Sequence, residues 1–174
     1  IMTLTHSGYL KTTPTSTYHT QNRGGKGIRS ISLNDEDFID FMVGLSNHDY
    51  LLFFTNEGRV YRMKGFQFPI SSRTAKGTPI INFLPLQNGE KVEAILPYNP
   101  EEEAKSLLFV TRNGIVKRTL MSEFKNINRT GKVAISLNEG DTLAFVRRTT
   151  GDEEILIAGD RGNAVRFKES AVRL

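Results

Sequence analysis

A turn-centred pattern recurs four times along the chain and constrains its fold more than any other feature. Each of four segments places a glycine between short apolar runs: LTHSGYLK (4–11), FTNEGRVYR (54–62), VTRNGIVKR (110–118) and AGDRGNAVRF (158–167). The turn glycines follow one another at intervals of 50, 56 and 48 residues, at Gly8, Gly58, Gly114 and Gly162. Short β-rich runs that meet at a Gly-containing turn are typical of β-hairpins. The pattern therefore predicts a hairpin in every repeat.

A second pattern follows the first three hairpins. Arg, Lys and Gly precede a β-branched residue in NRGGKGI (22–28), SRTAKGTPI (72–80) and INRTGKVAI (127–135). A strand, a polar turn and another strand come next, although residues 34–45 suit a short helical turn as well as a strand. Units of about four strands and 40–55 residues indicate an all-β protein with propeller-like blades. The predicted blades are 1–46, 47–103, 104–149 and an incomplete 150–174, a partial ring of roughly three and a half blades and hence a fragment.

Charged side chains form blocks whose sign alternates in step with this repeat. Residues 1–34 contain Lys and Arg but no acid, and residues 35–58 contain Asp and Glu but no Lys or Arg. Residues 59–89 carry only cations. The alternation continues, with a few exceptions, as an acidic 90–103, a basic 105–137 and an acidic 138–154. Random placement would indicate ordinary solvated loops, whereas this recurrence predicts a basic half near each hairpin and an acidic half near the last turn.

Several classes of chemistry are disfavoured by the residues present. The chain of 174 residues has no cysteine, so disulfides and cysteine-ligated metals are excluded. No apolar run approaches the roughly 20 residues that span a bilayer, and we expect no membrane partner. A P-loop needs Ser or Thr after its lysine, but Gly27 follows Lys26. The three histidines lie in polar or turn contexts without a nucleophile elbow or metal-ligand spacing. We therefore expect no catalytic residue and no metal site in this chain.

Binding of a phosphate backbone fits the basic segments better. Glycine allows backbone N–H groups to approach an anion closely, Arg offers a planar fork to phosphate, and Lys adds a point charge. In the segment 21–27, Arg23 and Lys26 flank a Gly-Gly pair. Cations recur in the later segments and in the hairpins. The candidate contacts outside that segment are Lys11, Arg29, Arg59, Arg62, Lys64, Arg73, Lys76, Arg112, Lys117, Arg118, Lys125, Arg129, Lys132, Arg161 and Arg166.

Such a basic rim predicts sequence-independent binding of duplex DNA. Aromatic residues are not interleaved with the cations as they are where single-stranded bases stack. No predicted helix carries Arg and Asn to base edges. Bending duplex DNA through 40–90° costs on the order of 1–6 kcal/mol, which a series of phosphate contacts offsets. A protein-interaction scaffold, whose acidic loops such as 101–103 bind a basic partner, is the alternative from another class.

The segment QNRGGKG resembles the gyrase-A box, QRRGGKG, of the C-terminal domains of bacterial DNA gyrase A proteins, with six of seven positions matching. The other hairpin and basic segments resemble successive blades of that family, so the resemblance covers essentially the whole chain. The related domain of topoisomerase IV, in which the box is absent or degraded, is the nearer alternative. Carried over by position, the box is Gln21, Asn22, Arg23, Gly24, Gly25, Lys26 and Gly27, with Asn22 in place of an Arg.

The resemblance implies a β-pinwheel whose blades exchange strands and which wraps duplex DNA around its basic rim. It also implies a non-catalytic part of an ATP-dependent type IIA topoisomerase that introduces negative supercoils. The catalytic tyrosine and the ATPase of the family, and hence its ATP and Mg²⁺, belong to other domains. The implied partners are duplex DNA, the rest of the gyrase A protein and the gyrase B protein, in the bacterial cytoplasm at the nucleoid.

Overall fold

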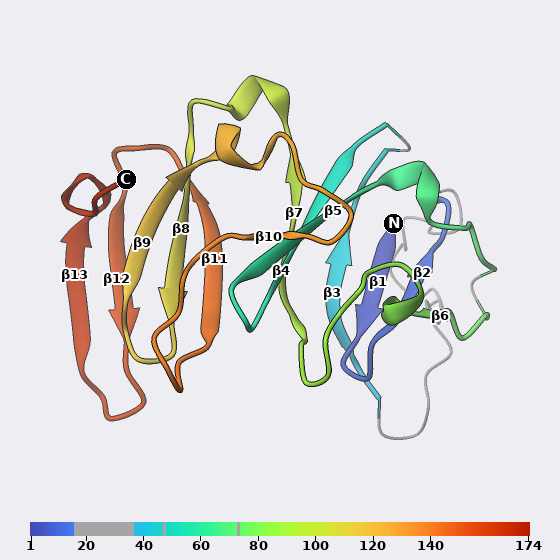
Figure 1. The fold of residues 1–174 in the computed structure, drawn as a ribbon, viewed down its shortest axis with the longest axis horizontal. Helices are drawn as coiled ribbons and strands as arrows, with labels where there is room; N and C mark the ends of the chain where they lie inside the picture. The colour runs from blue at the N-terminus through green and yellow to red at the C-terminus, as the bar shows by residue number, and fades with distance from the viewer. Residues whose placement is uncertain (16–36, 47, 73) are drawn as a thin grey trace, which may run out of the picture. The chain divides into compact units, whose positions relative to one another are not determined.

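A computed structural model of the chain describes residues 1–15, 37–46, 48–72 and 74–174, and within them the structure is built from antiparallel β-strands (Figure 1). The prediction of an all-β protein is confirmed, since the described residues contain no α-helix. Single 3-10 turns follow several strands, at Gly65–Gln67, Ile80–Asn82, Pro100–Glu102, Met121–Phe124 and Glu169–Ala171. The chain forms two compact units, Ile1–Leu51 with Met63–Asn88, and Leu52–Arg62 with Gly89–Leu174.

The first unit contains a four-stranded sheet in the order β3-β1-β2-β6. Its strands are β1 (Met2–Thr5), β2 (Tyr9–Thr12), β3 (Ile39–Val43) and β6 (Thr78–Pro79). β1 and β2 form the hairpin expected around Gly8, with Thr3 opposite Lys11. β3 pairs with β1, so the stretch that suited either a helical turn or a strand forms a strand. Buried Met2, Leu4 and Leu10 place the apolar face of this sheet in the core.

The second unit contains the remaining sheets. The first has the order β10-β5-β4-β7, from β4 (Tyr50–Thr55), β5 (Arg59–Lys64), β7 (Val92–Tyr98) and β10 (Lys132–Val133), although the outer ends of β4 and β5 belong to the first unit. The next has the order β11-β8-β9, from β8 (Ser106–Thr111), β9 (Val116–Leu120) and β11 (Leu143–Thr149). The last pairs β12 (Glu154–Ala158) with β13 (Ala164–Lys168). Phe54, Phe109 and Phe124 pack edge-on or tilted in the core, with centroids 5.5–6.1 Å apart.

Two short strands pair with the hairpin of the preceding repeat and not with the hairpin that comes just before them in the sequence. β6 follows the second hairpin in the sequence but pairs with β2 of the first hairpin. In the same way, β10 follows the third hairpin but pairs with β5 of the second, with Lys132 opposite Val60. Both come from the basic segments 72–80 and 127–135, so each basic segment is attached to the hairpin of the preceding repeat (Figure 1).

Carboxylates placed just before the last strand of a repeat explain part of the acidic blocks. In the first unit, Asp37 accepts hydrogen bonds from the backbone N–H and hydroxyl of Ser7 in the hairpin turn. Burial acts to raise the pKa of Asp37, but hydrogen bonds from Ser7, Thr5 and the Phe38 N–H lower it to about 2. In the second unit, Glu90 accepts a 2.7 Å hydrogen bond from Thr55 in its hairpin turn. These acids therefore tie each last strand to a turn.

Glu169 connects the last two sheets of the second unit. Its side chain is fully buried and accepts hydrogen bonds from the Thr149 hydroxyl and from the N–H groups of Gly151 and Glu153. The guanidinium of Arg118 lies 3.6 Å from its carboxylate. Burial acts to raise the pKa of Glu169, but these hydrogen bonds and the charge of Arg118 outweigh it, so the pKa lies below its usual value of 4.5.

Removal of this carboxylate is expected to destabilise the second unit. At neutral pH, Glu169→Ala leaves buried donors unsatisfied and should lower the free energy of unfolding by about 1–3 kcal/mol in urea titrations. A depressed pKa contributes stability above the unfolded value of 4.5 that is lost as the pH falls through the lower folded value. The difference between wild type and Glu169→Gln should therefore be constant above about pH 5.5 and shrink below 4.5. Exposed Glu153→Gln is the matched control, and an equal loss there would contradict this role.

Candidate nucleic-acid interface

The gyrase-A box residues predicted from the sequence lie outside the described residues, as do two further candidate cations. These are Gln21, Asn22, Arg23, Gly24, Gly25, Lys26 and Gly27 of the box, together with Arg29 and Arg73. Their role as DNA contacts stays a prediction. The interface is therefore built from the described cations of the hairpins and of the two exchanged segments.

Two of the predicted contacts are withdrawn because of where the fold places them. Lys11 is only 2% exposed, since it lies in the middle of β2, paired with Thr3 of β1. The side chain of Arg118 is 14% exposed and forms an ion pair with buried Glu169. A buried or paired cation does not reach a phosphate on the surface without breaking these contacts. The sequence reveals the charge of Lys11 and Arg118 but not the face of the strand on which each side chain lies.

Three other predicted contacts donate hydrogen bonds to backbone carbonyls of residues 123–130, in and just before the basic segment of the second unit. Arg59 donates a hydrogen bond of 2.8 Å from Nη2 to the carbonyl of Thr130. Arg62 donates from Nη1 to the carbonyl of Lys125. Lys132 donates from Nζ to the carbonyl of Glu123 over 2.7 Å. All three side chains belong to residues that are only partly exposed.

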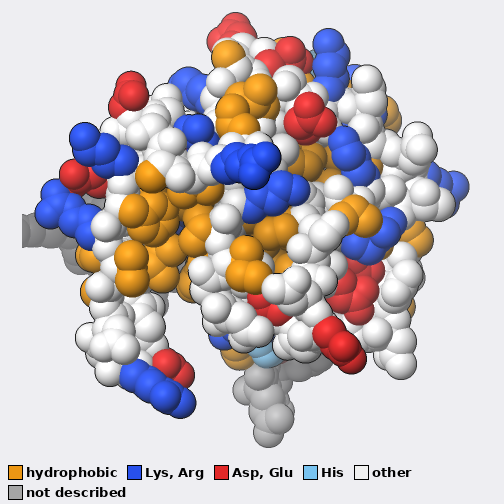
Figure 2. Space-filling model, turned by 60° about the vertical axis from the view of Figure 1, so that its left-hand side comes forward, with side chains coloured by type: hydrophobic (Ala, Val, Ile, Leu, Met, Phe, Trp, Pro, Cys, Tyr) orange, Lys and Arg blue, Asp and Glu red, His pale blue; other side chains and the backbone are white. Residues whose placement is uncertain are grey.

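The remaining predicted cations reach the surface. Five are exposed and form no ion pair with another described residue: Lys76, Arg112, Lys117, Arg129 and Arg161. Lys125 is exposed as well, with its Nζ 3.9 Å from the carboxylate of Glu103. Arg166 is also exposed but pairs with Glu154 across the β12–β13 hairpin. Lys64 is partly exposed and lies 5.1 Å from the ring centroid of Tyr50 and 5.6 Å from that of Phe66. Figure 2 shows Lys and Arg side chains at the surface, several of them beside exposed hydrophobic side chains.

Sequence reasoning missed Arg147, because it lies in a stretch that is otherwise acidic. Arg147 is exposed on β11, and its guanidinium lies 5.5 Å from the ring centroid of exposed Phe145. Its neighbour Arg148 pairs with Glu102 over 2.8 Å. Alternation of side chains along the strand, with Val146 buried between them, is the sequence signal that places Phe145 and Arg147 on one face.

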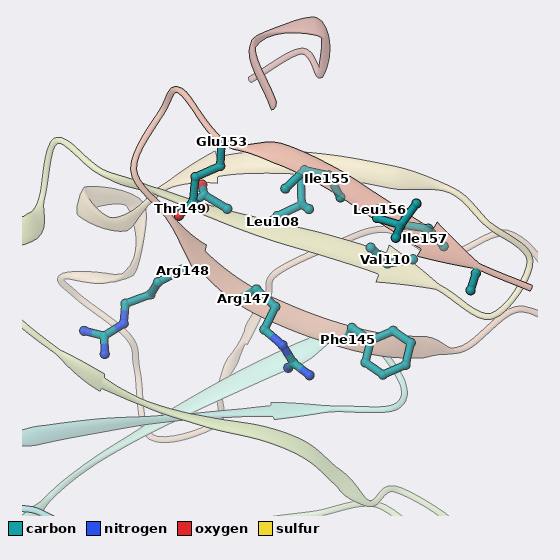
Figure 3. A pocket seen from close by; sticks show the side chains of 11 residues that line it. Leu108, Val110, Phe145, Arg147, Arg148, Thr149, Glu153, Ile155, Leu156 and Ile157 are labelled. Atoms are coloured by element: carbon teal, nitrogen blue, oxygen red, sulfur yellow. The ribbon is translucent and has the colours of Figure 1, made fainter. Parts of the chain in front are cut away.

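A cavity of about 500 Å³ lies beside these residues, between β12 and the sheet of β8 and β11 (Figure 3). Its walls are mainly aliphatic and aromatic, with Leu108, Phe145 and Ile155 among them. Arg147 and Arg148 line the same side as Phe145 in Figure 3. The hydroxyl of Thr149 is already used by Glu169, so it is not a free nucleophile. We therefore interpret this cavity as a gap in the packing between the sheets and not as a reaction site.

No group of three or more His, Cys, Asp or Glu side chains among the described residues is arranged to hold a metal ion. Within the same residues, no helix has the length and apolar character needed to cross a membrane. The chemistry that the described surface offers is electrostatic: exposed Arg forks and Lys ammonium groups on hairpins and exchanged segments, suited to phosphate groups.

Antiparallel sheets built on repeated hairpins, with short strands exchanged between repeats, define an all-β protein of the propeller class. The chain belongs to the family of DNA gyrase C-terminal domains, described as a beta-propeller, which matches residues 1–43, 49–99, 105–150 and 153–174. The resemblance found in the box and the blades is thereby confirmed at the level of the family.

Curated relatives and solved structures agree with this assignment. The chain is 47% identical over 174 residues to the DNA gyrase A proteins of Halalkalibacterium halodurans and of Staphylococcus epidermidis, covering 21% and 20% of those proteins and 99–100% of itself. It therefore spans about a fifth of the length of the curated relatives it matches. A C-terminal domain of DNA topoisomerase IV superposes with a TM-score of 0.82, and one of DNA gyrase A with 0.73. Both are 29% identical, and the match covers 99% of this chain and 52% and 55% of theirs.

Proposed function

We propose that this chain is the DNA-wrapping part of a DNA gyrase A protein. It binds duplex DNA without sequence preference through its exposed cations and bends it. The assembled enzyme then uses the bent segment to introduce negative supercoils with ATP. The observation that carries the proposal is the set of exposed Arg and Lys residues on the hairpins and exchanged segments of a chain from the gyrase C-terminal family.

The chain itself carries no step of the strand-passage chemistry in this proposal. DNA cleavage belongs to the rest of the gyrase A protein, and ATP with Mg²⁺ acts in other domains. The partners are duplex DNA, the remainder of gyrase A and the gyrase B protein, with the complex acting at the nucleoid in the bacterial cytoplasm. The support is that the curated relatives at 47% identity are gyrase A proteins and that the box retains six of seven residues.

A topoisomerase IV domain is the nearer alternative, and the TM-score of 0.82 favours it on fold. The sequence supports gyrase instead, because the solved domains of both enzymes share 29% identity with the chain, whereas the curated gyrase relatives share 47%.

The protein-scaffold alternative relied on the acids at 101–103 as the site that binds a basic partner. Glu102 pairs with Arg148 and Glu103 lies 3.9 Å from Lys125, so two of these acids already have partners within the chain.

Trapping of wrapped DNA tests the proposal directly. The full-length gyrase A protein is bound to a nicked circular duplex, the nick is sealed by DNA ligase, and the protein is removed before gel electrophoresis. A wrap of positive handedness should leave closed circles with an increased linking number. Adding the protein after ligation is the control and should leave the linking number unchanged. Identical topoisomer distributions in both orders of addition would refute wrapping.

A further inference from the structure

The segment 125–133 of the second unit, which includes β10, is held on β5 by contacts that do not involve exposed Arg129. Val133 pairs with Arg59 and Lys132 with Val60, which attaches the end of the segment to β5. The N–H groups of Ala134 and Ile135 both donate to the carbonyl of Gly58 in the preceding hairpin turn. The end of the segment therefore pairs with a strand of the preceding repeat, and its turn lies beside side chains of β5.

Two arginines of β5 fix that turn through carbonyl groups. Arg59 Nη2 donates to the carbonyl of Thr130, and its guanidinium carbon lies 6.0 Å from the ring centroid of Tyr61. Arg62 Nη1 donates to the carbonyl of Lys125 at the start of the same segment. Arg forks that bind carbonyls in this way act as braces across a loop, since each joins a strand side chain to a backbone position far away in the sequence.

Tyr61 supplies the surface on which the turn lies. A Cβ atom at Gly131 would come within 2.7 Å of Tyr61 Cε1 and 3.1 Å of the Val60 carbonyl, and Gly131 has φ +82°. Only glycine fits both the left-handed backbone and the close approach. Tyr61 is itself fixed, because its hydroxyl donates a 2.9 Å hydrogen bond to buried Glu90. The turn thus rests on a ring that is anchored in the core.

The first unit repeats this arrangement with different side chains. Gly77 has φ +97°, and a Cβ atom there would lie 2.7 Å from the carbonyl of Leu10 on β2. Ile80 N–H donates to the carbonyl of Gly8, as Ala134 does to Gly58. Lys76 of the segment lies 4.8 Å from the ring centroid of Tyr9, which occupies the place after the turn glycine that Arg59 has in the other hairpin. Attachment of a basic turn to the preceding hairpin is therefore a recurring feature.

Arg129 is left exposed by these contacts. It is the residue before Thr130, whose carbonyl Arg59 holds, and it lies within the turn closed by the Gly131 N–H and the Asn128 carbonyl, 2.9 Å apart. We infer that Arg59 and Arg62 are positioning residues that hold the 125–133 turn on Tyr61, and that Arg129 is the residue that contacts a DNA phosphate. This inference rests on the proposed function. It separates arginines that position the turn from the arginine that contacts DNA, although all carry the same charge.

A double-mutant cycle in the full-length gyrase A protein separates a brace from a contact. One phosphate contact contributes close to one unit of slope when log affinity for duplex DNA is plotted against log salt concentration. Arg129→Gln should reduce the slope by about one unit. Arg59→Gln should reduce it by a similar amount, because the turn no longer holds Arg129 in place, and the double variant should match either single variant. Losses that add in the double variant would show that Arg59 contacts DNA itself and would overturn the inference.

Two further measurements keep the inference separate from the proposed function. Gly131→Ala changes no charge but displaces the turn, so it should also reduce the slope, whereas Gly140→Ala, with φ +79° and open space around it, should not. Hydrogen exchange of the Gly131 and Ala134 amides, which donate to the carbonyls of Asn128 and Gly58, should accelerate in Arg59→Gln and stay unchanged in Arg129→Gln. Unchanged exchange in Arg59→Gln would refute the brace. Lack of DNA binding by the wild-type protein would instead refute the proposed function, while the exchange experiment would still report on the brace.

Discussion

The affinity of this chain, within the full-length protein, for linear duplex DNA is expected to fall by roughly 10³–10⁵ between 50 and 200 mM salt. This range applies to 6–10 neutralised phosphates. The described residues offer five exposed candidates without an ion pair, and Arg23 and Lys26 of the box would bring the total to seven, within that range. Each neutralised phosphate releases counterions, so the loss of affinity grows with every contact. Fluorescence anisotropy with a labelled duplex across the salt series measures it.

The sequence of the duplex provides the control for this experiment. Phosphate contacts carry no base information, so duplexes of different sequence should give the same slope. A protein-interaction scaffold that binds DNA only incidentally predicts a flat dependence on salt, and that result would contradict the wrapping function. A steep slope confined to one sequence would contradict it in a different way, since it would require contacts to base edges.

The hairpins could be predicted from the sequence because the signal for a hairpin is local. Gly58 and Gly114 lie between short apolar runs, and both are in turns that connect paired strands. The all-β class follows from the repetition of that signal. Strand exchange could not be derived from periodicity, because the pairing of Lys132 with Val60 joins residues that are far apart in the sequence. Only the resemblance to a known family implied it.

The candidate interface could be predicted in its charge but not in the role of each cation. Lys11 and Lys117 occupy equivalent places after their turn glycines, yet Lys11 is buried and Lys117 is exposed. Arg59 and Arg129 have the same side chain, and only the folded structure shows that Arg59 reaches the carbonyl of Thr130. Whether a cation supports the fold or faces solvent depends on what the neighbouring repeat presents to it. A one-dimensional pattern of charge does not contain that information.

Replacement of both box cations is expected to remove the supercoiling activity of the assembled enzyme. Arg23→Ala with Lys26→Ala eliminates two candidate phosphate contacts from the segment that distinguishes gyrase from topoisomerase IV in the family resemblance. ATP-dependent relaxation should remain largely intact, because cleavage and ATP hydrolysis are assigned to other domains. Both activities are measured on the same plasmid by agarose gel. An equal loss of both would contradict this division between wrapping and strand passage.

The control for this variant must remove the same charge from the same domain. Lys105→Ala with Arg148→Ala does so at residues that pair with Glu102, with Lys105 Nζ 3.8 Å and Arg148 Nη1 2.8 Å from its carboxylate oxygens. Because these cations are already partly neutralised, their loss should leave supercoiling in place. If Gly24 and Gly25 serve only to form a tight turn, the box variant should instead lower the melting temperature and leave DNA bending unchanged. A melting curve recorded beside a bending assay therefore decides whether Arg23 and Lys26 act on the DNA or on the fold.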